Sequence, residues 1–465
     1  MTTAIERLAQ FATTVPVASH PEAAIATAKR AFLDTIGCML LGASSKVTEV
    51  AIRAAEGWGT GKAPVYGTGK RLPAPWAAMA NGASAHAFDL DDYTLQANDH
   101  PSAVLVPALL AAVTDRPMSG QATGRALLDA YLVGLEAIFR LGEAVNMGHY
   151  NRGWHTTSTL GSIGASIAIA RLMRLDARQT AAAVSLTTSL AAGYVSQFGT
   201  MGKPLHAGFS AKTGLLAAGL GRAGATAYAG ALDGPVSFAS LLVPDGAAAF
   251  DRAFAKLGAP WGTEEFGLGA KLYPSCGYTH RGIDGALELH ERLGLSSANE
   301  IARATISLPD FHLAILPFGV PRDPTEALFS MPWCAAVALA TGSCTSEDFT
   351  PAALARQDLL ALTGRISVEA RRPLRPEINV DPEDPDRVTV ILQDGRRAET
   401  RVARWTGAPG REMSEAQLRA KFRDCCNRHD PDPTRAAARA DAIEAAIDGL
   451  DHAPSLDALT ASLAH

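Results

Sequence analysis

Three long segments built almost entirely of small and apolar residues constrain the fold most strongly. They cover residues 161–172, 180–193 and 207–224, and each is rich in Ala, Gly, Ser and Thr. Small side chains let helix backbones approach closely. A helix that is apolar on nearly every side must be surrounded by other helices or by a second subunit. The segments therefore predict central helices of a bundle, or helices at a subunit interface.

The helical pattern extends from residue 1 to about residue 265 and then changes. Alternating or β-branched sequences predict four strands, at residues 304–308, 365–370, 388–393 and 398–403. Asp394-Gly395 lies between the last two and is typical of a type I′ hairpin turn. Helical patterns return after residue 412, where Ser414 and Gln417 match a capping box.

These patterns predict a mainly α fold with two domains. Residues 1–268 and 405–465 are expected to form a large all-helical domain built from both chain ends. Residues 269–404 are expected to form a smaller α+β lid domain inserted between them. A chain of 465 residues is long enough to bury two such cores.

Charge and composition argue against several classes of function. The chain has 42 Lys and Arg against 47 Asp and Glu, a net charge of −5, so we expect no nucleic acid partner. No apolar run reaches the roughly 18–20 residues of a membrane span, and the N-terminus lacks a secretory signal pattern. We therefore expect a cytoplasmic protein with no membrane partner. Its six cysteines are scattered without a CxxC motif, which argues against a zinc or iron–sulfur site.

An acidic cluster is the first candidate site. Asp89, Asp91 and Asp92 follow His86, and Asp99-His100 comes shortly after. Carboxylates this close repel one another unless a cation, a proton or hydrogen bonds compensate. The cluster therefore either binds a metal such as Mg²⁺ or Zn²⁺, or caps helix ends and turns.

Two further motifs place single cationic or titratable groups near helix starts. His155 follows Gly153-Trp154, and Gly153 predicts a bend before a helix whose N-terminus would favour an anionic ligand. A structural role for this histidine is an equal alternative. Lys203 precedes Pro204 and is expected between two small-residue helices, in a charge-poor stretch. Its ammonium group would bind a carboxylate of the protein or of a substrate. The spacing around it does not match a P-loop.

The fourth motif falls at the predicted seam between the domains, where ligand clefts are common. It supplies positive charge from Lys271 and Arg281 and proton donors from Tyr273 and His280. Ser275 or Cys276 as a covalent nucleophile is a weaker alternative, because no GxSxG elbow surrounds them.

Taken together and in order, the motifs resemble those of the MmgE/PrpD family. That family includes 2-methylcitrate dehydratases, cis-aconitate decarboxylases and iminodisuccinate epimerases. The resemblance covers residues 34 to about 340, and "MSEAQLRAKF" extends it toward the C-terminus. The matching segments are "DTIGCMLLG", "NGASAHAFDLDD", "HPSAVLVPALLA", "YNRGWHTTSTLGSIGAS", "GTMGKPLHAG", "KLYPSCGYTHRGIDGAL" and "EALFSMPWCAAVAL".

The resemblance implies the two-domain fold, a homodimer formed through the helical domains, no organic cofactor and no metal. The site residues of the decarboxylase branch carry over to Asp89, His100, His155, Lys203 and His280. We add a predicted substrate-binding set around them: Tyr93, Thr94, Lys271, Tyr273, Arg281 and Trp333.

This sequence departs from the family pattern at three places. Tyr93 stands where the family has Thr, with Thr94 next to it, and Trp333 stands where a Tyr is often found. The loop before His100 is one residue longer than in the vertebrate decarboxylases, with Asn98 and Asp99 just before the histidine. These changes lie where substrate shape and a proton donor would be set.

The implied activity is that of a cofactor-independent lyase, a dehydratase or decarboxylase of a small di- or tricarboxylic acid such as 2-methylcitrate or cis-aconitate. The expected mechanism is acid/base catalysis through a carbanion-like centre next to a carboxylate. We expect His100 and His155 to exchange protons, Lys203 and His280 to bind carboxylate, and Asp89 to orient a histidine. The alternatives are an epimerase of a dicarboxylate such as iminodisuccinate, a metal-dependent hydrolase, and a non-catalytic member of the family.

Overall fold

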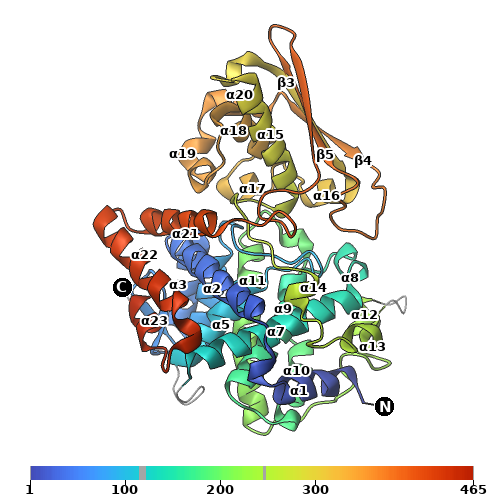
Figure 1. The fold of residues 1–465 in the computed structure, drawn as a ribbon, viewed down its shortest axis with the longest axis vertical. Helices are drawn as coiled ribbons and strands as arrows, with labels where there is room; N and C mark the ends of the chain where they lie inside the picture. The colour runs from blue at the N-terminus through green and yellow to red at the C-terminus, as the bar shows by residue number, and fades with distance from the viewer. Residues whose placement is uncertain (1, 115–121, 244–247, 464–465) are drawn as a thin grey trace.

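The computed structural model describes residues 2–114, 122–243 and 248–463, and most of them are helical. Figure 1 shows a lower part made of helices and an upper part in which helices pack beside a sheet. We call these the helical part and the α+β part. The helical part contains α1 (Ala4–Thr14), α2 (Glu22–Gly42), α3 (Lys46–Glu56), the hairpin β1 (Ala63–Val65) and β2 (Lys70–Leu72), α4 (Ala74–Ala85), α5 (Ser102–Thr114), α7 (Gly124–Val145), α8 (Gly148–Asn151), α9 (Thr156–Leu172), α10 (Ala177–Thr188), α11 (Gly202–Arg222), α12 (Phe238–Leu242), α13 (Phe250–Phe254), α14 (Gly262–Glu265), α21 (Glu415–His429), α22 (Pro433–Asp448) and α23 (Asp457–Ser462).

Both ends of the chain contribute to the helical part. Helix α21 packs along α2, so the last helices lie beside the first ones in Figure 1. Lys421 of α21 forms a buried 2.5 Å ion pair with Asp34 of α2. Ser414 caps α21 in the predicted capping box with Gln417. The mainly α fold is confirmed, while the limits at residues 268 and 405 stay a prediction.

The small-residue segments 161–172 and 207–224 lie in α9 and α11, which pack together as predicted, although one face of α11 is exposed. Segment 180–193 is helical only as far as Thr188, where α10 ends. All residues of α9 from Thr156 to Ala170 are buried, and α11 packs against both α9 and α4. The contacts are close because glycines face neighbouring backbones. Gly208 of α11 lies against Met79 of α4, and Gly214 lies against Ala165 of α9. Helix α11 is thereby held rigidly at the centre of the bundle.

A methyl group at Gly208 is expected to destabilise the protein. A Cβ atom there would lie 2.3 Å from the backbone oxygen of Met79, and a backbone atom between packed helices cannot move aside cheaply. We expect Gly208→Ala to lower the free energy of unfolding by at least about 2 kcal/mol, as overpacking does. Gly219→Ala on the same helix is the control, because a Cβ there meets nothing within 4 Å. Equal melting temperatures for the two variants would contradict this packing.

The α+β part has its own hydrophobic core, separate from that of the helical part. A four-stranded sheet in the order β4-β3-β5-β6 lies beside its helices. Strands β3 and β4 are parallel, and the other two pairs are antiparallel. The elements are α15 (His280–Leu293), β3 (Ile301–Pro309), α16 (Asp310–Ile315), α17 (Pro324–Ala327), α18 (Met331–Thr341), α19 (Pro351–Leu354), α20 (Gln357–Thr363), β4 (Ile366–Arg371), β5 (Asp386–Leu392) and β6 (Arg397–Val402).

All four predicted strands are present, but the turn between the last two differs from the prediction. A type I′ turn needs positive φ at both central residues. Here Gly395 has φ 86° and Asp394 does not have positive φ. The Asp394 carboxylate instead accepts a hydrogen bond from the backbone of Arg396, which stabilises a longer loop. The hairpin is confirmed and the type I′ turn is wrong.

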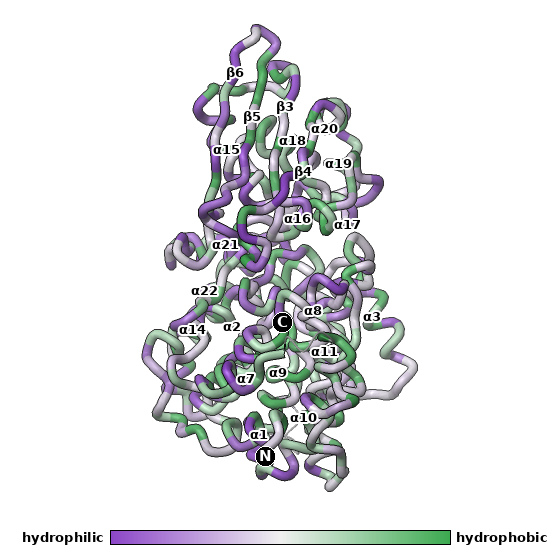
Figure 2. The backbone as a smooth tube through the Cα atoms, turned by 90° about the vertical axis from the view of Figure 1, so that its right-hand side faces the viewer, coloured by the Kyte–Doolittle hydropathy of each residue, from purple (hydrophilic) through white to green (hydrophobic). Residues whose placement is uncertain are grey.

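No single helix in the described ranges is both long and apolar enough to cross a membrane. Helices α2 and α3 are long and apolar enough only when taken together, and the two are bent by 83° relative to each other. Figure 2 shows hydrophobic residues concentrated along central helices such as α9 and along strand β5. The apolar stretches therefore follow the two cores.

Candidate active site

Four helix ends in the helical part converge on one place. His86 ends α4, His100 precedes α5, and His155 is the N-cap residue of α9. Gly153 bends the chain before α9 with φ 92°, as predicted. Lys203 lies inside the first turn of α11 rather than between helices, because a proline at the third helical position needs no backbone donor.

The other wall comes from the chain segments around the α+β part. Lys271 and Tyr278 lie in the segment that leads to α15, Asn379 lies between β4 and β5, and Trp405 follows β6. Together with the helix ends they enclose a cavity of about 60 Å³. Its lining comprises Tyr93, Thr94, Leu95, Asn98, Asp99, His100, Tyr150, His155, Phe198, Lys203, Lys271, Cys276, Gly277, Tyr278, Asn379 and Trp405.

Asp89 is the anchor for both cavity lysines. Its carboxylate is 2.6 Å from Lys203 Nζ and forms an even closer ion pair with Lys271. Burial favours a neutral carboxyl, but the two ammonium groups hold the pKa of Asp89 well below its usual value. Asp89 was expected to orient a histidine, yet His100 Nε2 is 3.5 Å away. Its main contacts are the lysines.

Asp91 holds two histidines instead. Its carboxylate is 2.8 Å from His86 Nδ1 and 3.2 Å from His100 Nδ1. Both contacts use Nδ1, so the Nε2 atom of each ring is left for other partners. Burial lowers the pKa of His100 to about 4, and the charge of Lys271 acts in the same direction. His100 is therefore neutral in the empty cavity at pH 7.

Asp92 supports the start of a helix, in line with the capping alternative for the acidic cluster. Its carboxylate accepts hydrogen bonds from the Ser102 backbone at 3.2 Å and from the Ser102 hydroxyl at 2.5 Å. These bonds fix the start of α5, which directly follows His100.

The acidic cluster does offer the donor atoms of a metal site. Ligand atoms of His86, Asp89, Asp91 and His100 lie within 4.8 Å of one another. However, the oxygens of Asp89 are already bound by two lysine ammonium groups. A divalent cation would have to displace these lysines from the carboxylate. Lys203 and Lys271 thus compensate the repulsion among the clustered carboxylates.

His155 is almost fully buried and lines the cavity. Burial and the nearby positive groups hold its pKa well below the usual histidine value. Its ring meets the Phe198 ring edge-on, with centroids 4.8 Å apart. Lys203 Nζ lies 5.1 Å from the centroid of that same phenylalanine ring. The Phe198 ring thus contacts both the His155 ring and the Lys203 ammonium group.

Asp99 presents an unusual carboxyl group in the wall. It is 1% exposed, and neither oxygen has a hydrogen-bond partner among the described residues. Burial, with a contribution from Asp91, raises the pKa of Asp99 to about 8. Asp99 is therefore a neutral carboxylic acid at pH 7.

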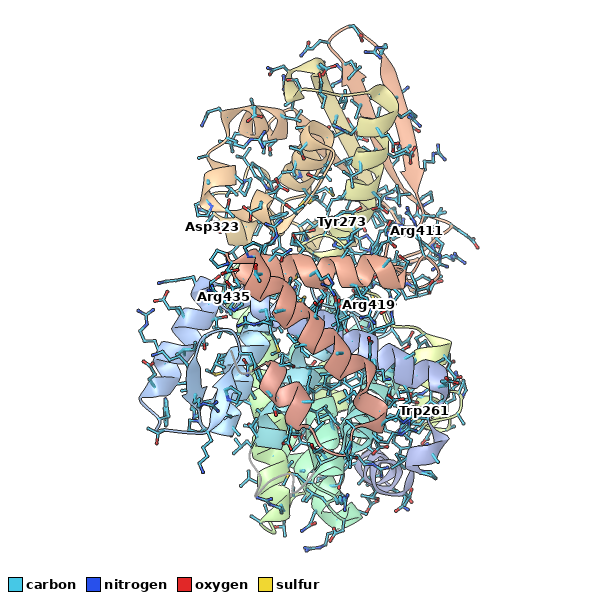
Figure 3. The ribbon with its side chains drawn as sticks, turned by 60° about the vertical axis from the view of Figure 1, so that its left-hand side comes forward. Trp261, Tyr273, Asp323, Arg411, Arg419 and Arg435 are labelled. Atoms are coloured by element: carbon cyan, nitrogen blue, oxygen red, sulfur yellow. The ribbon has the colours of Figure 1, made fainter. Side chains whose placement is uncertain are left out.

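Three residues of the predicted substrate-binding set lie outside the cavity wall. Tyr273 donates a hydrogen bond to Asp284 at 2.5 Å, and Figure 3 shows it near Arg411, at the junction between the α+β part and α21. Arg281 pairs with Asp386 at 2.7 Å. Trp333 is buried in the core of the α+β part and donates to the Asp348 carbonyl. Each has its own structural partner, whereas Tyr93, Thr94 and Lys271 do line the cavity.

His280 lies beside the cavity without lining it. Its ring centroid is 6.0 Å from that of Trp405, and Nε2 is 3.3 Å from the Ser275 carbonyl. Burial lowers the pKa of His280 to about 3. The carboxylate-binding role predicted for it therefore has no direct geometric support.

The alternative nucleophiles are not activated. The Ser275 hydroxyl is hydrogen-bonded to Thr279 at 2.8 Å, and no histidine of the described residues forms a hydrogen bond with that hydroxyl. Burial raises the pKa of Cys276 to about 11, so its thiol stays protonated at neutral pH. The six cysteines are all buried and free.

Several wall residues were missed by sequence reasoning. Tyr278 donates to Asn379 Oδ1 at 2.8 Å, and Asn379 in turn donates to Asn98. This chain of bonds ties the α+β part to the loop before His100. Tyr150 and Trp405 complete the wall. Tyr150 and Tyr278 stand inside recognised motifs. No motif or hydrophobic pattern in the sequence marks Asn379 or Trp405 as a wall residue.

A larger open groove lies elsewhere, along α15 and β6, with a volume of about 970 Å³. It is open to solvent and contains Tyr273 and Arg411 but none of the cavity histidines or lysines. The smaller cavity is the candidate active site, because two lysines and two histidines meet in its wall.

Known proteins resemble this chain along most of its length. Cis-aconitate decarboxylase of Homo sapiens is 27% identical over 412 residues, which are 86% of this chain and 82% of the human protein. The Mus musculus enzyme of that name is 27% identical over 415 residues, 86% and 82% of the two chains. That of Aspergillus terreus is 28% identical over 346 residues, 71% and 70% of the two chains.

Models of two domains of one protein family match successive parts of the chain. The MmgE/PrpD N-terminal domain matches residues 6–251, and the MmgE/PrpD C-terminal domain matches residues 273–447. The two matches together cover most of the chain, including Lys203, His100 and His155 of the cavity wall, whereas Lys271 lies between them. This chain therefore belongs to the MmgE/PrpD family.

Proposed function

We propose that this protein is a cofactor-independent lyase acting on a small di- or tricarboxylic acid, with decarboxylation of cis-aconitate as the first reaction to test. The observation that carries the proposal is the convergence of Lys203, Lys271, His100 and His155 in one buried cavity. Dehydration of an acid such as 2-methylcitrate would use the same groups. The names of the similar proteins favour decarboxylation.

The lysines would bind substrate carboxylates. Charge-assisted hydrogen bonds are about twice as strong as neutral ones and strengthen further when water is excluded. Lys203 and Lys271 both form ion pairs with Asp89, so their positions are set before substrate arrives. Such preorganised cations can stabilise the charge that develops next to a carboxylate.

The histidines would supply the proton. In the empty cavity His100 and His155 are neutral, because burial and the lysines disfavour a further positive charge. A bound polycarboxylate reverses the local field and favours protonated imidazole. In decarboxylation, the C–C bond to a carboxylate breaks, CO₂ leaves, and the electron pair stays as an allylic carbanion. An imidazolium then protonates that carbanion, so one proton is taken from solvent per turnover.

The cavity must enlarge for this chemistry. About 60 Å³ holds roughly two water molecules, far less than a tricarboxylic acid needs. We infer that the wall containing Tyr278 and Asn379 moves when substrate enters, since it closes on Asn98 through side-chain hydrogen bonds. We expect the helix ends of the helical part to stay in place, because α9 is buried and α11 packs closely against α9 and α4.

We also propose that the protein is a homodimer formed through the helical part. Phe209, Leu216 and Leu220 follow one another on the outer face of α11 and are 41%, 44% and 41% exposed. Apolar side chains gathered on one helix face are typical of an interaction surface. The opposite face of α11 carries Lys203, so a partner here would clamp the helix that positions this lysine. Light scattering of the purified protein gives the mass that tests this proposal.

The proposed reaction is tested by proton NMR in D₂O. The purified protein is incubated with cis-aconitate, 2-methylcitrate or iminodisuccinate, with and without EDTA. We expect cis-aconitate to give a five-carbon unsaturated dicarboxylate carrying one deuterium, at the same rate with the chelator. Conversion of 2-methylcitrate to an unsaturated acid would support the dehydratase form of the proposal.

Two outcomes would contradict the lyase. Racemisation of iminodisuccinate with deuterium exchange, and no change in the other acids, would establish the epimerase instead. No change in any acid would favour a non-catalytic member of the family. Loss of turnover with EDTA would restore the metal-dependent alternative.

A further inference from the structure

His155 is in direct contact with a second imidazole that lies outside the cavity wall. His206 of α11 places its Nδ1 atom 2.9 Å from His155 Nδ1. The ring centroids are 5.2 Å apart and the rings are tilted by 48°. Both side chains are buried, at 1% and 6% exposure. His206 lies three residues after Lys203, so one helix positions both the cation and this second ring.

The contact restricts the protonation of both rings. A nitrogen–nitrogen hydrogen bond needs one donor and one acceptor, and a neutral imidazole has one of each. When both rings are neutral, one must carry its proton on Nδ1 and the other on Nε2. Burial lowers the pKa of His206 to about 4 and holds that of His155 well below its usual value, so the pair is neutral at pH 7.

The contact also decides which atom of His155 is available. Because His206 occupies Nδ1, only Nε2 of His155 remains for a group in the cavity. His86, His100 and Lys203 are the other titratable or charged groups that influence His155. The His86 ring lies 6.3 Å from the His155 ring between centroids. Within the described residues, the Nδ1 contact with His206 is the only hydrogen bond of the His155 ring.

We propose that His206 is the positioning residue for His155: it donates from Nδ1, and thereby holds His155 with a proton on Nε2 facing the cavity. The choice of direction rests on the proposed lyase function, because a lyase must deliver a proton to its substrate. A hydrogen bond to the second ring nitrogen is the usual means by which proteins fix a histidine tautomer. The acid function of His155 thus depends on a residue that does not touch substrate.

The proposal is tested without substrate by ¹⁵N NMR of the full-length protein labelled at histidine. Signals are assigned by their loss in His155→Gln and His206→Gln. We expect the Nδ1–H tautomer for His206 and the Nε2–H tautomer for His155. The reverse assignment, or tautomer averaging at His155 in the unsubstituted protein, would overturn the proposal.

Substitution of His206 separates its donor function from its volume. In His206→Phe the ring is kept and the donor removed, and we expect His155 to populate both tautomers. In His206→Asn a side-chain N–H is available near the position of Nδ1, and we expect the Nε2–H tautomer of His155 to return. His149→Phe is the matched control, since it removes another buried histidine whose Nε2 contacts Thr159 at 2.8 Å.

Kinetics on whichever acid is turned over provide the second readout. We expect His206→Phe to lower kcat about 10- to 100-fold, as loss of an outer partner does, with KM changed less than about threefold. His206→Asn should recover most of kcat, and His149→Phe should retain it. Equal kcat in the Phe and unsubstituted proteins would overturn the positioning role. If no acid is turned over, the lyase proposal fails while the NMR result still decides the tautomer.

Discussion

Lys203→Met is expected to lower kcat/KM on the accepted acid by about 10²- to 10³-fold. That range corresponds to loss of one charged hydrogen bond to the reacting anion in a water-excluded site. The effect is large because the lysine is 4% exposed and cannot be replaced by water without breaking the cavity wall. Methionine keeps an unbranched side chain of similar volume but lacks the ammonium group that lies 5.1 Å from the Phe198 and Phe329 ring centroids.

The fold is expected to survive this substitution. Lys271 still pairs with Asp89 in the variant, so the buried carboxylate retains a cation. Thermal melting and circular dichroism check this before kinetics are compared. Lys212→Met is the matched control, because Lys212 lies on the same helix but contacts Trp76, 4.4 Å from its ring centroid. Full turnover by a folded Lys203→Met variant would remove Lys203 from the site.

Asp99→Asn is expected to stabilise the protein, and more so as pH rises. The folded-state pKa of Asp99 is about 8, against about 3.9 for an unperturbed aspartate. Between these values the folded state holds a proton that the unfolded state has lost. Stability therefore falls with rising pH through this window, by up to about 1.4 kcal/mol per pH unit. Asparagine has nearly the same shape and carries no charge at any of these pH values.

The measurement is the difference in unfolding free energy between Asp99→Asn and the unsubstituted protein at pH 5 and pH 8. We expect the advantage of the variant to grow by about 2–4 kcal/mol between these pH values. Because both proteins share every other titrating group, their contributions cancel in the difference. A difference that is the same at both pH values would show that Asp99 is charged in the fold.

The sequence predicts the fold well where local patterns decide it. Small-residue segments become central helices because no other environment covers an all-apolar helix, and alternating segments become strands β3 to β6. The hairpin turn is missed in detail because Asp394 bonds its carboxylate to Arg396, an option that the Asp-Gly dipeptide does not exclude. Turn types depend on such single bonds.

The site is predictable to the extent that motifs carry it. Lys203, His100 and His155 are at the cavity because each stands at a helix end that the chain pattern marks. Arg281 and Trp333 also stand in recognised motifs. Their side chains, however, point into the α+β part, toward Asp386 and Asp348. Sequence spacing does not give that direction, because it depends on which face of α15 or α18 meets the sheet and the loops.

The partners of the histidines are the least predictable part. His100 is held at Nδ1 by the Asp92 carbonyl at 2.9 Å and by Asp91 at 3.2 Å rather than by Asp89, whose carboxylate pairs with the lysines. His206 stands in a recognised motif, yet its contact with His155 joins residues 51 positions apart. The sequence signal that His206 lies near the site is its position three residues after Lys203, because residues three apart share one helix face.

A crystal structure with propane-1,2,3-tricarboxylate, the saturated analogue of cis-aconitate, tests most directly whether this cavity holds a carboxylic acid. The account predicts the analogue between the helix ends and the segment leading to α15. One carboxylate should lie within hydrogen-bond distance of Lys203 Nζ or Lys271 Nζ, with its carbon chain beside His155 Nε2. An analogue bound elsewhere, with the cavity closed and both lysines still paired only with Asp89, would contradict it.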